Sequence, residues 1–126
     1  MCSCNQDFEA VELLPEGSRD VLVAGLQQLG LALGDRVVVH SSLSSLGHVV
    51  GGVETLIQAL LSAIGPAGTL MVPYFTDFVT HQAVFDPANP PPSVVGDVTN
   101  RLRTWPGSIL SNCPSHSVVA VGSAAA

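Results

Sequence analysis

The sequence predicts an α/β fold, with a parallel or mixed sheet and flanking helices. Three segments carry this prediction: a valine-rich run at 36–39, a helical apolar pattern at 53–64 and a second apolar run at 68–75. A strand, a helix and a strand within about 40 residues form a βαβ unit, whose two strands are almost always parallel. The chain has 126 residues, of which 47% are apolar, so it is at most one domain and can bury a core.

The first helix is predicted between Ser18 and Gly30. Residues 1–17 form an irregular lead-in that ends with a Pro-Glu-Gly sequence. Ser18 is a typical N-cap, and Asp20 places a negative charge near the positive end of the helix dipole. Gly30 is a typical C-terminal stop. The apolar positions between them follow helical spacing: Val21, Leu22, Leu26 and Leu29.

The βαβ unit begins with a strand predicted over 36–42. Its run of valines indicates burial on both faces, as in a central strand of a parallel sheet. The helix that follows ends at Gly65-Pro66, and the next strand covers 68–75. Six apolar positions give this helix a complete core-facing stripe: Val53, Leu56, Ile57, Leu60, Leu61 and Ile64.

The second half of the chain is predicted to hold a long irregular segment and three short elements. Prolines between 86 and 92 exclude a helix or a central strand there, because proline lacks the backbone donor and restricts the residue before it. A loop as long as 76–93 is usually functional or disordered. We expect a short helix over 96–104 and strands at 108–110 and 117–122.

Composition and charge exclude several classes of partner. The net charge is −6, with four arginines and no lysine, so we expect neither nucleic acid nor an anionic membrane surface as a partner. The start of the chain does not resemble a signal peptide, and no apolar run reaches the length of a membrane span. The three cysteines give no disulfide framework. These features predict a reduced, cytoplasmic protein.

A polar turn between the first strand and the following helix is the main candidate site. The segment 40–52 carries two histidines, four serines and three glycines. Ligands of open α/β folds bind at the carboxyl ends of strands, and a helix start offers free N–H groups and a positive dipole end to a phosphate. Neither a G-x-G-x-x-G nor a Walker A sequence is present, so spacing alone leaves ligand binding and a plain tight turn equally open.

The four histidines divide by their context in the sequence. His48 and His81 lie in predicted loops and are expected at the surface. His40, at the end of the first strand, and His116, before the last, are better placed to form the floor of a site. For both, a structural histidine held by hydrogen bonds remains the alternative.

Two other chemistries have weaker support from the residues. A serine hydrolase needs a serine within reach of an oriented histidine, but neighbouring strand residues such as His40 and Ser41 point to opposite faces. A G-x-S-x-G elbow is also absent. Cys2-x-Cys4 and Cys113-x-x-His116 together count four metal ligands, but neither spacing is a strong zinc signature. No metal is therefore expected.

Several motifs occur in an order that resembles a known family. They are His40-Ser41-Ser42-Leu43 with Gly47 and Gly51-Gly52, Gly68-Thr69-Leu70 through Pro73, Phe85-Asp86-Pro87, Pro114-x-His116-Ser117 and Ala120-x-Gly122. Over residues 18–122 the chain resembles the aminoglycoside 3-N-acetyltransferases, antibiotic acetyltransferases whose fold is unrelated to that of the GNAT acetyltransferases. Each motif is modest alone, and their order and spacing make the match specific.

The resemblance implies transfer of an acetyl group from acetyl-CoA, as co-substrate, to the 3-amino group of an aminoglycoside. It also implies that 18–126 is a partial acetyl-CoA-binding domain, the N-terminal half of a larger α/β/α domain whose catalytic histidine and acidic partner lie later. His116 is the one candidate for a base in this chain, and the chain alone is expected to be inactive. The residues that resemble the family's coenzyme site and its walls are His40, Ser41, Ser42, Leu43, Pro73, Tyr74, Phe75, Thr76 and Ser117.

One departure and one alternative accompany the resemblance. The family often has Arg-Ser-x-His-Pro before the second His-Ser pair, whereas this run reads Leu110-Ser111-Asn112-Cys113 here, which is expected to weaken coenzyme binding. The alternative is a non-catalytic α/β remnant or interaction module. Only 11% of residues are charged, against roughly 25% in soluble domains, so both functions predict an uncovered apolar face and self-association.

Overall fold

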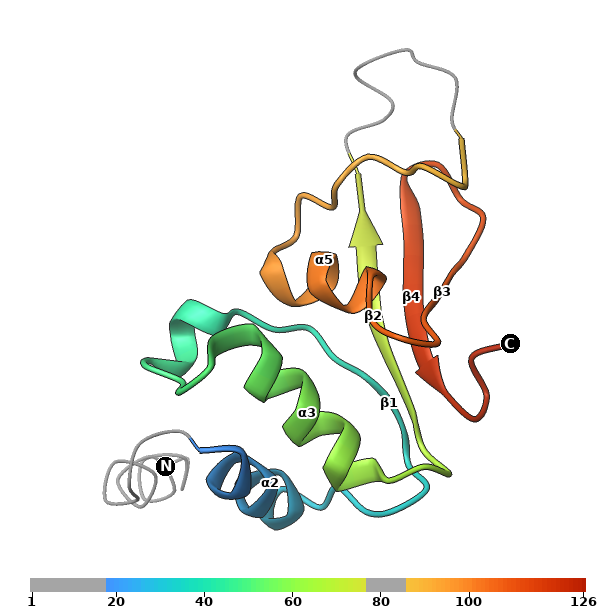
Figure 1. The fold of residues 1–126 in the computed structure, drawn as a ribbon. Coiled ribbons are helices and arrows are strands. Elements are labelled where there is room, and N and C mark those ends of the chain that lie inside the picture. Colours follow the sequence, from blue (N-terminus) through green and yellow to red (C-terminus); the bar gives the residue numbers. More distant parts are fainter. Residues whose placement is uncertain (1–17, 77–85) are drawn as a thin grey trace, which may run out of the picture.

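A computed structural model describes residues 18–76 and 86–126. Within these ranges the sheet has four strands in the order β1-β2-β4-β3, with helices beside it (Figure 1). The elements, in chain order, are α2 (Arg19–Gln28), β1 (Arg36–Val38), the 3-10 helix η1 (Leu43–Leu46), α3 (Gly52–Ile64), β2 (Thr69–Phe75), α5 (Asp97–Arg103), β3 (Ile109–Leu110) and β4 (His116–Gly122). The predicted α/β class is confirmed, and α5, β3 and β4 are the short helix and two strands expected in the second half.

The sheet is mixed, and the βαβ unit forms its parallel part. β1 pairs with β2 in parallel, starting with Arg36 opposite Thr69, and α3 connects the two strands. β4 pairs antiparallel with β2 along all seven residues of each strand, with Phe75 opposite His116. β3 adds a two-residue edge strand next to β4. The parallel connection predicted from the sequence is therefore confirmed.

The prediction for the first strand is wrong in both length and burial. β1 has three residues instead of spanning 36–42, and it lies at the edge of the sheet. Val37 packs against the core, but Val38 is 60% exposed. The chain leaves the ladder after Val39, whose N–H donates to the carbonyl of Met71 at 2.9 Å. A run of valines favours β structure, but it does not say whether a strand lies on both sides, so it could not separate a central strand from an edge strand.

Local signals account for the first two helices. Ser18 caps α2, its hydroxyl accepting from the N–H of Val21 at 3.4 Å, as predicted. α3 ends at Gly65, whose φ of 66° lies in the left-handed region that glycine adopts without strain. The predicted apolar stripe of α3 is confirmed: Leu56, Ile57, Leu60 and Ile64 are buried, and Val53 and Leu61 pack against the core from its margin.

The core lies between the helices and one face of the sheet. α2 packs on α3, and α3 and α5 pack on β2 (Figure 1). Successive strand residues point to opposite faces, so every second residue of β2 and β4 contributes to this core. Its buried members are Leu56, Ile57, Leu60, Ile64, Leu70, Val72, Tyr74, Val98, Leu102, Val119 and Val121.

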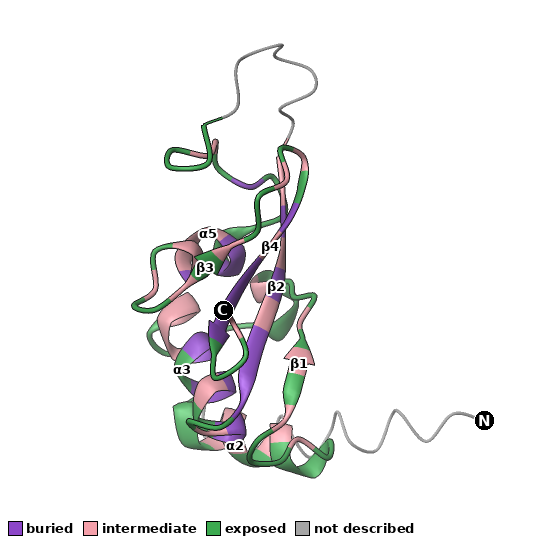
Figure 2. Ribbon diagram, turned by 90° about the vertical axis from the view of Figure 1, so that its right-hand side faces the viewer, coloured by how far each residue is buried: buried purple, intermediate pink, exposed green. Residues whose placement is uncertain are grey.

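The opposite face of the sheet carries the alternate residues. Figure 2 looks onto this face, with the strands in front of the helices, and no helix of the described residues covers it. Residues 123–126 turn back over one end, where the N–H of Ala124 donates to Oγ1 of Thr69 at 2.9 Å. We call this surface the open sheet face; by strand register its members are Val38, Met71, Pro73, Phe75, Ile109, His116, Val118 and Ala120.

Residues 86–96, which include most of the described part of the loop predicted over 76–93, contain neither helix nor strand and are held against β2. The hydroxyl of Tyr74 donates to the carbonyl of Pro91 at 2.8 Å. Residues 77–85, which include His81, and the lead-in 1–17 lie outside the described residues. Among the residues that are described, no helix has the length and apolarity needed to cross a membrane.

Candidate functional site

A cleft of about 720 Å³ lies between the polar turn after β1 and the segment that leads into α5. Its volume falls within the range of small-molecule and cofactor sites. One wall is the polar turn predicted as the main candidate site. The lining residues are Ser41, Ser42, Leu43, Ser44, Gly47, His48, Val49 and Gly52 on that side, and Val94, Val95, Gly96, Asp97 and Val98 on the other.

The serines of the polar turn hydrogen-bond to one another. Oγ of Ser42 lies 3.1 Å from Oγ of Ser44 and accepts from the hydroxyl of Ser45 at 3.0 Å. The backbone forms η1 here, in which the N–H of Ser45 donates to the carbonyl of Ser42 at 3.1 Å. All three residues are exposed. Because a hydroxyl has one donor and two acceptor positions, this cluster keeps capacity to bond a ligand.

The first turn of α3 forms the end of the cleft next to the polar turn. Gly51 has φ 82° and Gly52 has φ 61°, and these left-handed conformations turn the chain into the helix. A Cβ on Gly51 would collide with Oγ1 of Thr55, which itself donates to the carbonyl of Val50 at 2.6 Å. The dipole of this 13-residue helix places positive partial charge at its start, and Gly52 lines the cleft. This arrangement suits an anion such as a phosphate.

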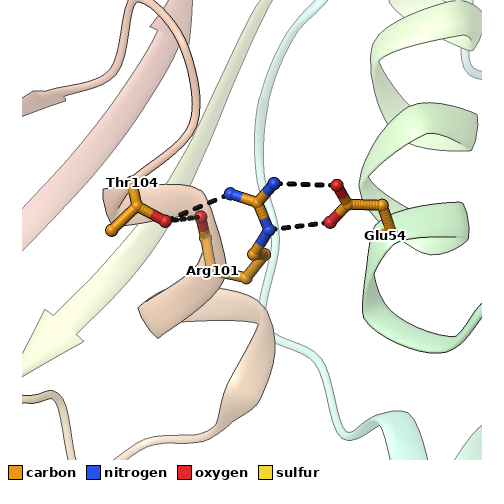
Figure 3. A network of polar contacts seen from close by, with 3 residues as sticks. All are labelled: Glu54, Arg101 and Thr104. Carbon is orange, nitrogen blue, oxygen red and sulfur yellow. Dashed lines mark hydrogen bonds and ion pairs between the residues drawn. The ribbon is translucent and has the colours of Figure 1, made fainter.

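An ion pair that sequence reasoning missed joins the two walls of the cleft (Figure 3). Arg101 donates through Nε and Nη2 to the two carboxylate oxygens of Glu54, both at 2.7 Å. Its guanidinium also lies 4.8 Å from the ring centroid of Trp105 and donates to Oγ1 of Thr104 at 3.1 Å. The hydrogen bond from Arg101 lowers the pKa of Glu54, and the carboxylate in turn raises the pKa of Arg101.

This ion pair holds α5 against the start of α3. Glu54 is in the first turn of α3 and Arg101 is in the last turn of α5. The starts of both helices contribute lining residues, so the pair links the elements that form the walls, in addition to the packing of Val98 and Leu102 in the core. A pairing across 47 residues leaves no local signal by which it could have been found.

His116 and Phe75 lie at the same end of the sheet as the cleft, but on the open sheet face. Phe75 ends β2, His116 begins β4, and their ring centroids are 5.1 Å apart. Nδ1 of His116 is 2.8 Å from Oγ of Ser115. Val94, which lines the cleft, donates its N–H to the carbonyl of Phe75 at 2.8 Å. One backbone hydrogen bond therefore links the cleft wall to the ring pair.

The side chains of Tyr74 and Thr76 hold backbone segments near the cleft instead of lining it. Tyr74 is buried in the core with its hydroxyl on Pro91, and burial raises the pKa of that hydroxyl. Thr76 donates through Oγ1 to the carbonyl of Pro114 at 2.7 Å, which ties the end of β2 to the turn before β4. Both residues position the chain that surrounds the candidate site.

Ser117 stabilises the turn between β3 and β4. It is 2% exposed, and its Oγ lies 2.8 Å and 2.5 Å from the carbonyl oxygens of Ser111 and Cys113. The backbone N–H groups of His116 and Ser115 lower the pKa of the Cys113 thiol in the same turn. The hydroxyl of Ser117 is thus occupied by backbone groups of its own turn.

The residues predicted to bind the coenzyme divide into two groups in the structure. Ser41, Ser42 and Leu43 line the cleft, and their assignment as coenzyme ligands remains a prediction, as it does for the others. His40 precedes them and is exposed, so its expected position at the end of a buried strand is wrong. The opposite wall, 94–98, was missed because it joins the site only through the fold.

The chemistry available in the cleft comes from hydroxyl groups, backbone amides, a helix dipole, the imidazole of His48 and the carboxylate of Asp97. Within 18–76 and 86–126, no three residues among His, Cys, Asp and Glu gather where they could hold a metal ion. Cys2 and Cys4 of the weak zinc pattern lie outside the described residues. The groups present suit a ligand that carries amides and phosphates.

Comparison with known sequences connects this site to a family of enzymes. A family model described as aminoglycoside 3-N-acetyltransferase matches residues 38–126. The aminoglycoside N(3)-acetyltransferase IX of Micromonospora chalcea is 37% identical over 119 residues, and the match covers 80% of this chain and 42% of that protein. The region that the family model matches includes the polar turn, the residues that line the cleft, the last residue of β1 and all of β2, β3 and β4.

Solved structures agree with the sequence comparison. The crystal structure of aminoglycoside acetyltransferase AAC(3)-Xa superposes with a TM-score of 0.80 at 32% identity, over 96% of this chain and 48% of that one. A structure of AAC-IIIb as a binary complex with CoASH superposes with a TM-score of 0.77 at 32% identity, over 88% of this chain and 48% of that one. The chain spans about half the length of the relatives that it matches.

Proposed function

The chain belongs to the aminoglycoside 3-N-acetyltransferase family, and on that premise we propose that it binds acetyl-CoA and takes part in acetyl transfer to the 3-amino group of an aminoglycoside. Its relatives are named as aminoglycoside acetyltransferases, which are acyltransferases, and one of them is known as a complex with CoASH. Acetylation of the antibiotic would contribute to resistance. The observation that carries the proposal is the cleft between the polar turn and α5.

The cleft supplies groups of the kind that coenzyme A needs. The coenzyme joins a pantetheine arm, with two amides and a thiol, to a nucleotide that carries phosphates. The hydroxyls of Ser41 and Ser42 suit the amide groups, and the start of α3 at Gly52 suits a phosphate. Val94 and Val95 offer apolar contact to the methylene groups of the arm. The cleft therefore suits coenzyme A in the chemical type of its lining groups and in its volume.

Acetyl transfer forms a C–N bond to the amine and breaks the C–S bond of the thioester. The acceptor ammonium must lose a proton before its nitrogen attacks, and the thioester oxygen needs hydrogen-bond donors as it gains negative charge. The leaving sulfur becomes the coenzyme thiol when it takes up a proton. In this scheme the chain contributes alignment of the donor and hydroxyl donors from the polar turn.

His116 is the candidate within this chain for the group that receives the ammonium proton. It is exposed on the open sheet face beside Phe75. Nδ1 lies 2.8 Å from Oγ of Ser115, and in the tautomer in which Nδ1–H donates to that hydroxyl, Nε2 is the nitrogen that can accept the proton. The acidic balance of the chain, with a net charge of −6, suits a cationic amino sugar as the acceptor.

We propose that the chain alone holds the donor without turnover. It spans about half of its relatives, and the family resemblance assigns the catalytic histidine and its acidic partner to a later part. The same relation of lengths favours the alternative, a non-catalytic remnant or interaction module, as does the departure from the family pattern at 110–113. Binding of acetyl-CoA without turnover would therefore support the proposed donor site, and absence of binding would support the alternative.

Calorimetric titration with acetyl-CoA tests the binding step. We expect saturable binding that Ser42→Ala weakens and Ser62→Ala leaves unchanged, since both serines are exposed but only Ser42 of the two lines the cleft. Absence of binding at millimolar acetyl-CoA contradicts the proposal. Acetylation of a gentamicin-type amine by this chain alone contradicts the assignment of the base to a later part of the family fold.

A further inference from the structure

We propose that Arg101 is a positioning residue for donor binding, because it binds Glu54 and so keeps that carboxylate from competing with an anion at the start of α3. The inference rests on the proposed function for the identity of the anion, which is the phosphate-bearing part of acetyl-CoA. It deepens that function by giving a role in donor binding to a residue that is not among those that line the cleft.

Glu54 lies where its carboxylate can compete with a ligand for the start of α3. Gly51 is the N-cap residue, so Glu54 is the third residue of the helix. In a capping box, a glutamate at this position reaches back to the backbone N–H of the N-cap residue, and the positive end of the helix dipole attracts any carboxylate in the first turn. The same end of the helix attracts a phosphate. An uncompensated carboxylate on Glu54 would therefore oppose the binding of an anionic ligand.

The backbone groups that can serve a ligand belong to this same turn. The N–H of Gly52 donates to the carbonyl of Val49 at 2.9 Å, so it is already occupied. The next two N–H groups, those of Val53 and Glu54, have no acceptor four residues earlier within the helix. With a rise of about 1.5 Å per residue, Glu54 follows Gly52 by only about 3 Å along the axis, well inside a Debye length of about 10 Å. The charge of Glu54 therefore acts directly on an anion at this turn.

Arg101 holds the carboxylate and balances its charge (Figure 3). It donates to both carboxylate oxygens of Glu54 at 2.7 Å, a fork geometry that fixes the orientation of the acid. The guanidinium is itself held by the ring of Trp105, 4.8 Å from the ring centroid, and by Oγ1 of Thr104 at 3.1 Å. A glutamate is ionised at pH 7 with or without a partner. Removal of the arginine alone would therefore leave a free negative charge at the start of α3.

A structural link between α3 and α5 would give a different pattern of effects from a positioning residue. If the pair acts only as a link between the two helices, loss of either partner should disturb the cleft to the same extent. If Arg101 acts on the charge of Glu54, the arginine is needed only while Glu54 is charged. The order of affinities among variants therefore distinguishes the two roles.

Calorimetric titration of the 126-residue chain with acetyl-CoA tests the proposal. Arg101→Met should weaken binding at least about fivefold, because it exposes an anionic ligand to the charge of Glu54. Glu54→Gln should bind at least as tightly as the unchanged chain. The double variant Glu54→Gln/Arg101→Met should recover most of the affinity, and Arg101→Lys should retain most of it, because lysine keeps the positive charge.

Arg36→Met is the matched control for the loss of one positive charge. Arg36 is exposed and begins β1, whereas the cleft follows the other end of that strand. Its distance from the first turn of α3 exceeds a Debye length, because five extended residues span about 16 Å. This variant should therefore bind acetyl-CoA as the unchanged chain does.

Salt and stability give two readouts that a structural link would not reproduce. The ratio of the dissociation constants of Arg101→Met and the unchanged chain should fall between about 50 and about 300 mM sodium chloride, because salt screens the charge of Glu54. A displaced cleft wall would keep this ratio constant. Both single variants lose the ion pair, so they should lose similar stability in urea while they differ in affinity.

Each outcome decides the proposal. Equal losses of affinity in Glu54→Gln and Arg101→Met, or no recovery in the double variant, overturn it in favour of a structural link. Sodium pyrophosphate, followed through the backbone amide NMR signals of Val53 and Glu54, separates this role from the proposed function. If pyrophosphate binds the unchanged chain more tightly than Arg101→Met while acetyl-CoA does not bind, the proposed function fails and the role of Arg101 stands. If neither probe binds, the role of Arg101 is refuted as well.

Discussion

The two faces of β2 show how differently one strand can be used. On the side of the helices, Leu70 and Val72 are fully buried beneath α3 and α5. On the open sheet face, Met71 and Pro73 are half-buried, with no helix of the described residues above them. The covered side provides the core and borders the cleft, whereas the other side carries no helix of the described residues. Substitutions on the two sides should therefore lower the free energy of unfolding by different amounts.

Truncation of the covered core should have the largest effect. Ile57→Ala removes a side chain that is 0% exposed and should lower the free energy of unfolding by about 2–5 kcal/mol. Val38→Ala on the open sheet face should cost less than about 1 kcal/mol, because most of that side chain is in solvent. Urea denaturation followed by circular dichroism measures both. Equal losses would mean that the open sheet face is already covered in solution.

The turn into α3 should be the next most sensitive position on the covered side. Gly51→Ala should destabilise by about 1–2 kcal/mol, because its φ of 82° is left-handed and the new Cβ meets Oγ1 of Thr55. Gly52→Ala is the control, with φ 61° but no atom within 4 Å of the added carbon. Urea denaturation measures the loss in free energy of unfolding for each variant, and we expect the larger loss for Gly51→Ala. A larger loss for Gly52→Ala would refute the packing argument.

The Glu54–Arg101 pair should give the chain a pH-dependent component of stability. The folded pKa of Glu54 is lowered from 4.5 by the hydrogen bond from Arg101, so its contribution is present above pH 4.5 and is lost as the pH falls through the folded pKa. Glu54→Gln should therefore flatten the decline of the melting temperature below pH 4.5.

The matched control for this pair is Asp20→Asn. It removes an exposed carboxylate that lies 4.0 Å from Nε of Arg19, without the two short hydrogen bonds that Arg101 gives to Glu54. It should leave most of the acid-side decline in place. Thermal unfolding monitored at several pH values compares the three proteins. If Glu54→Gln and the unchanged protein decline in parallel, the pair does not form in solution.

The smallest expected effect concerns the turn that ends at the open sheet face. Backbone N–H groups of His116 and Ser115 lower the pKa of the Cys113 thiol from 9.0, so its alkylation rate should have a midpoint below pH 9.0. The measurement uses iodoacetamide on a background with Cys2→Ser and Cys4→Ser. Ser117→Ala should move this midpoint upward, because the hydroxyl holds the turn. An unchanged midpoint would show that the turn keeps its geometry without that hydroxyl.

Local patterns in the sequence were sufficient for most of the secondary structure. The cap at Ser18, the stripe from Val53 to Ile64 and the stop at Gly65 each depend on neighbouring residues, and all three are confirmed. The polar turn could be recognised as a candidate site for the same reason, because its serines and glycines are contiguous. The ordered motifs were specific enough to indicate the family before any structural comparison.

Other features could not be read locally because they depend on contacts between distant residues. The second wall of the cleft comes from 94–98, and the pair of Glu54 with Arg101 spans 47 residues. Neighbouring strand residues such as Tyr74 and Phe75 alternate between faces, but which of the two faces the helices cover is visible only in the fold. Because Tyr74 and Phe75 are neighbours in the sequence, they were predicted as one group of site residues, whereas the pleat of the strand places their side chains on opposite faces.

The sequence by itself determined the helices, the parallel βαβ unit, the polar turn and the family, because each of these is encoded in short-range spacing or in the order of motifs. Only the tertiary structure decided that β1 is an edge strand, that the cleft lies between the polar turn and α5, and that no helix of the described residues covers one face of the sheet. The physical reason is that burial depends on what packs against a residue. Val38 and Leu70 both have apolar side chains, but helices cover only the second.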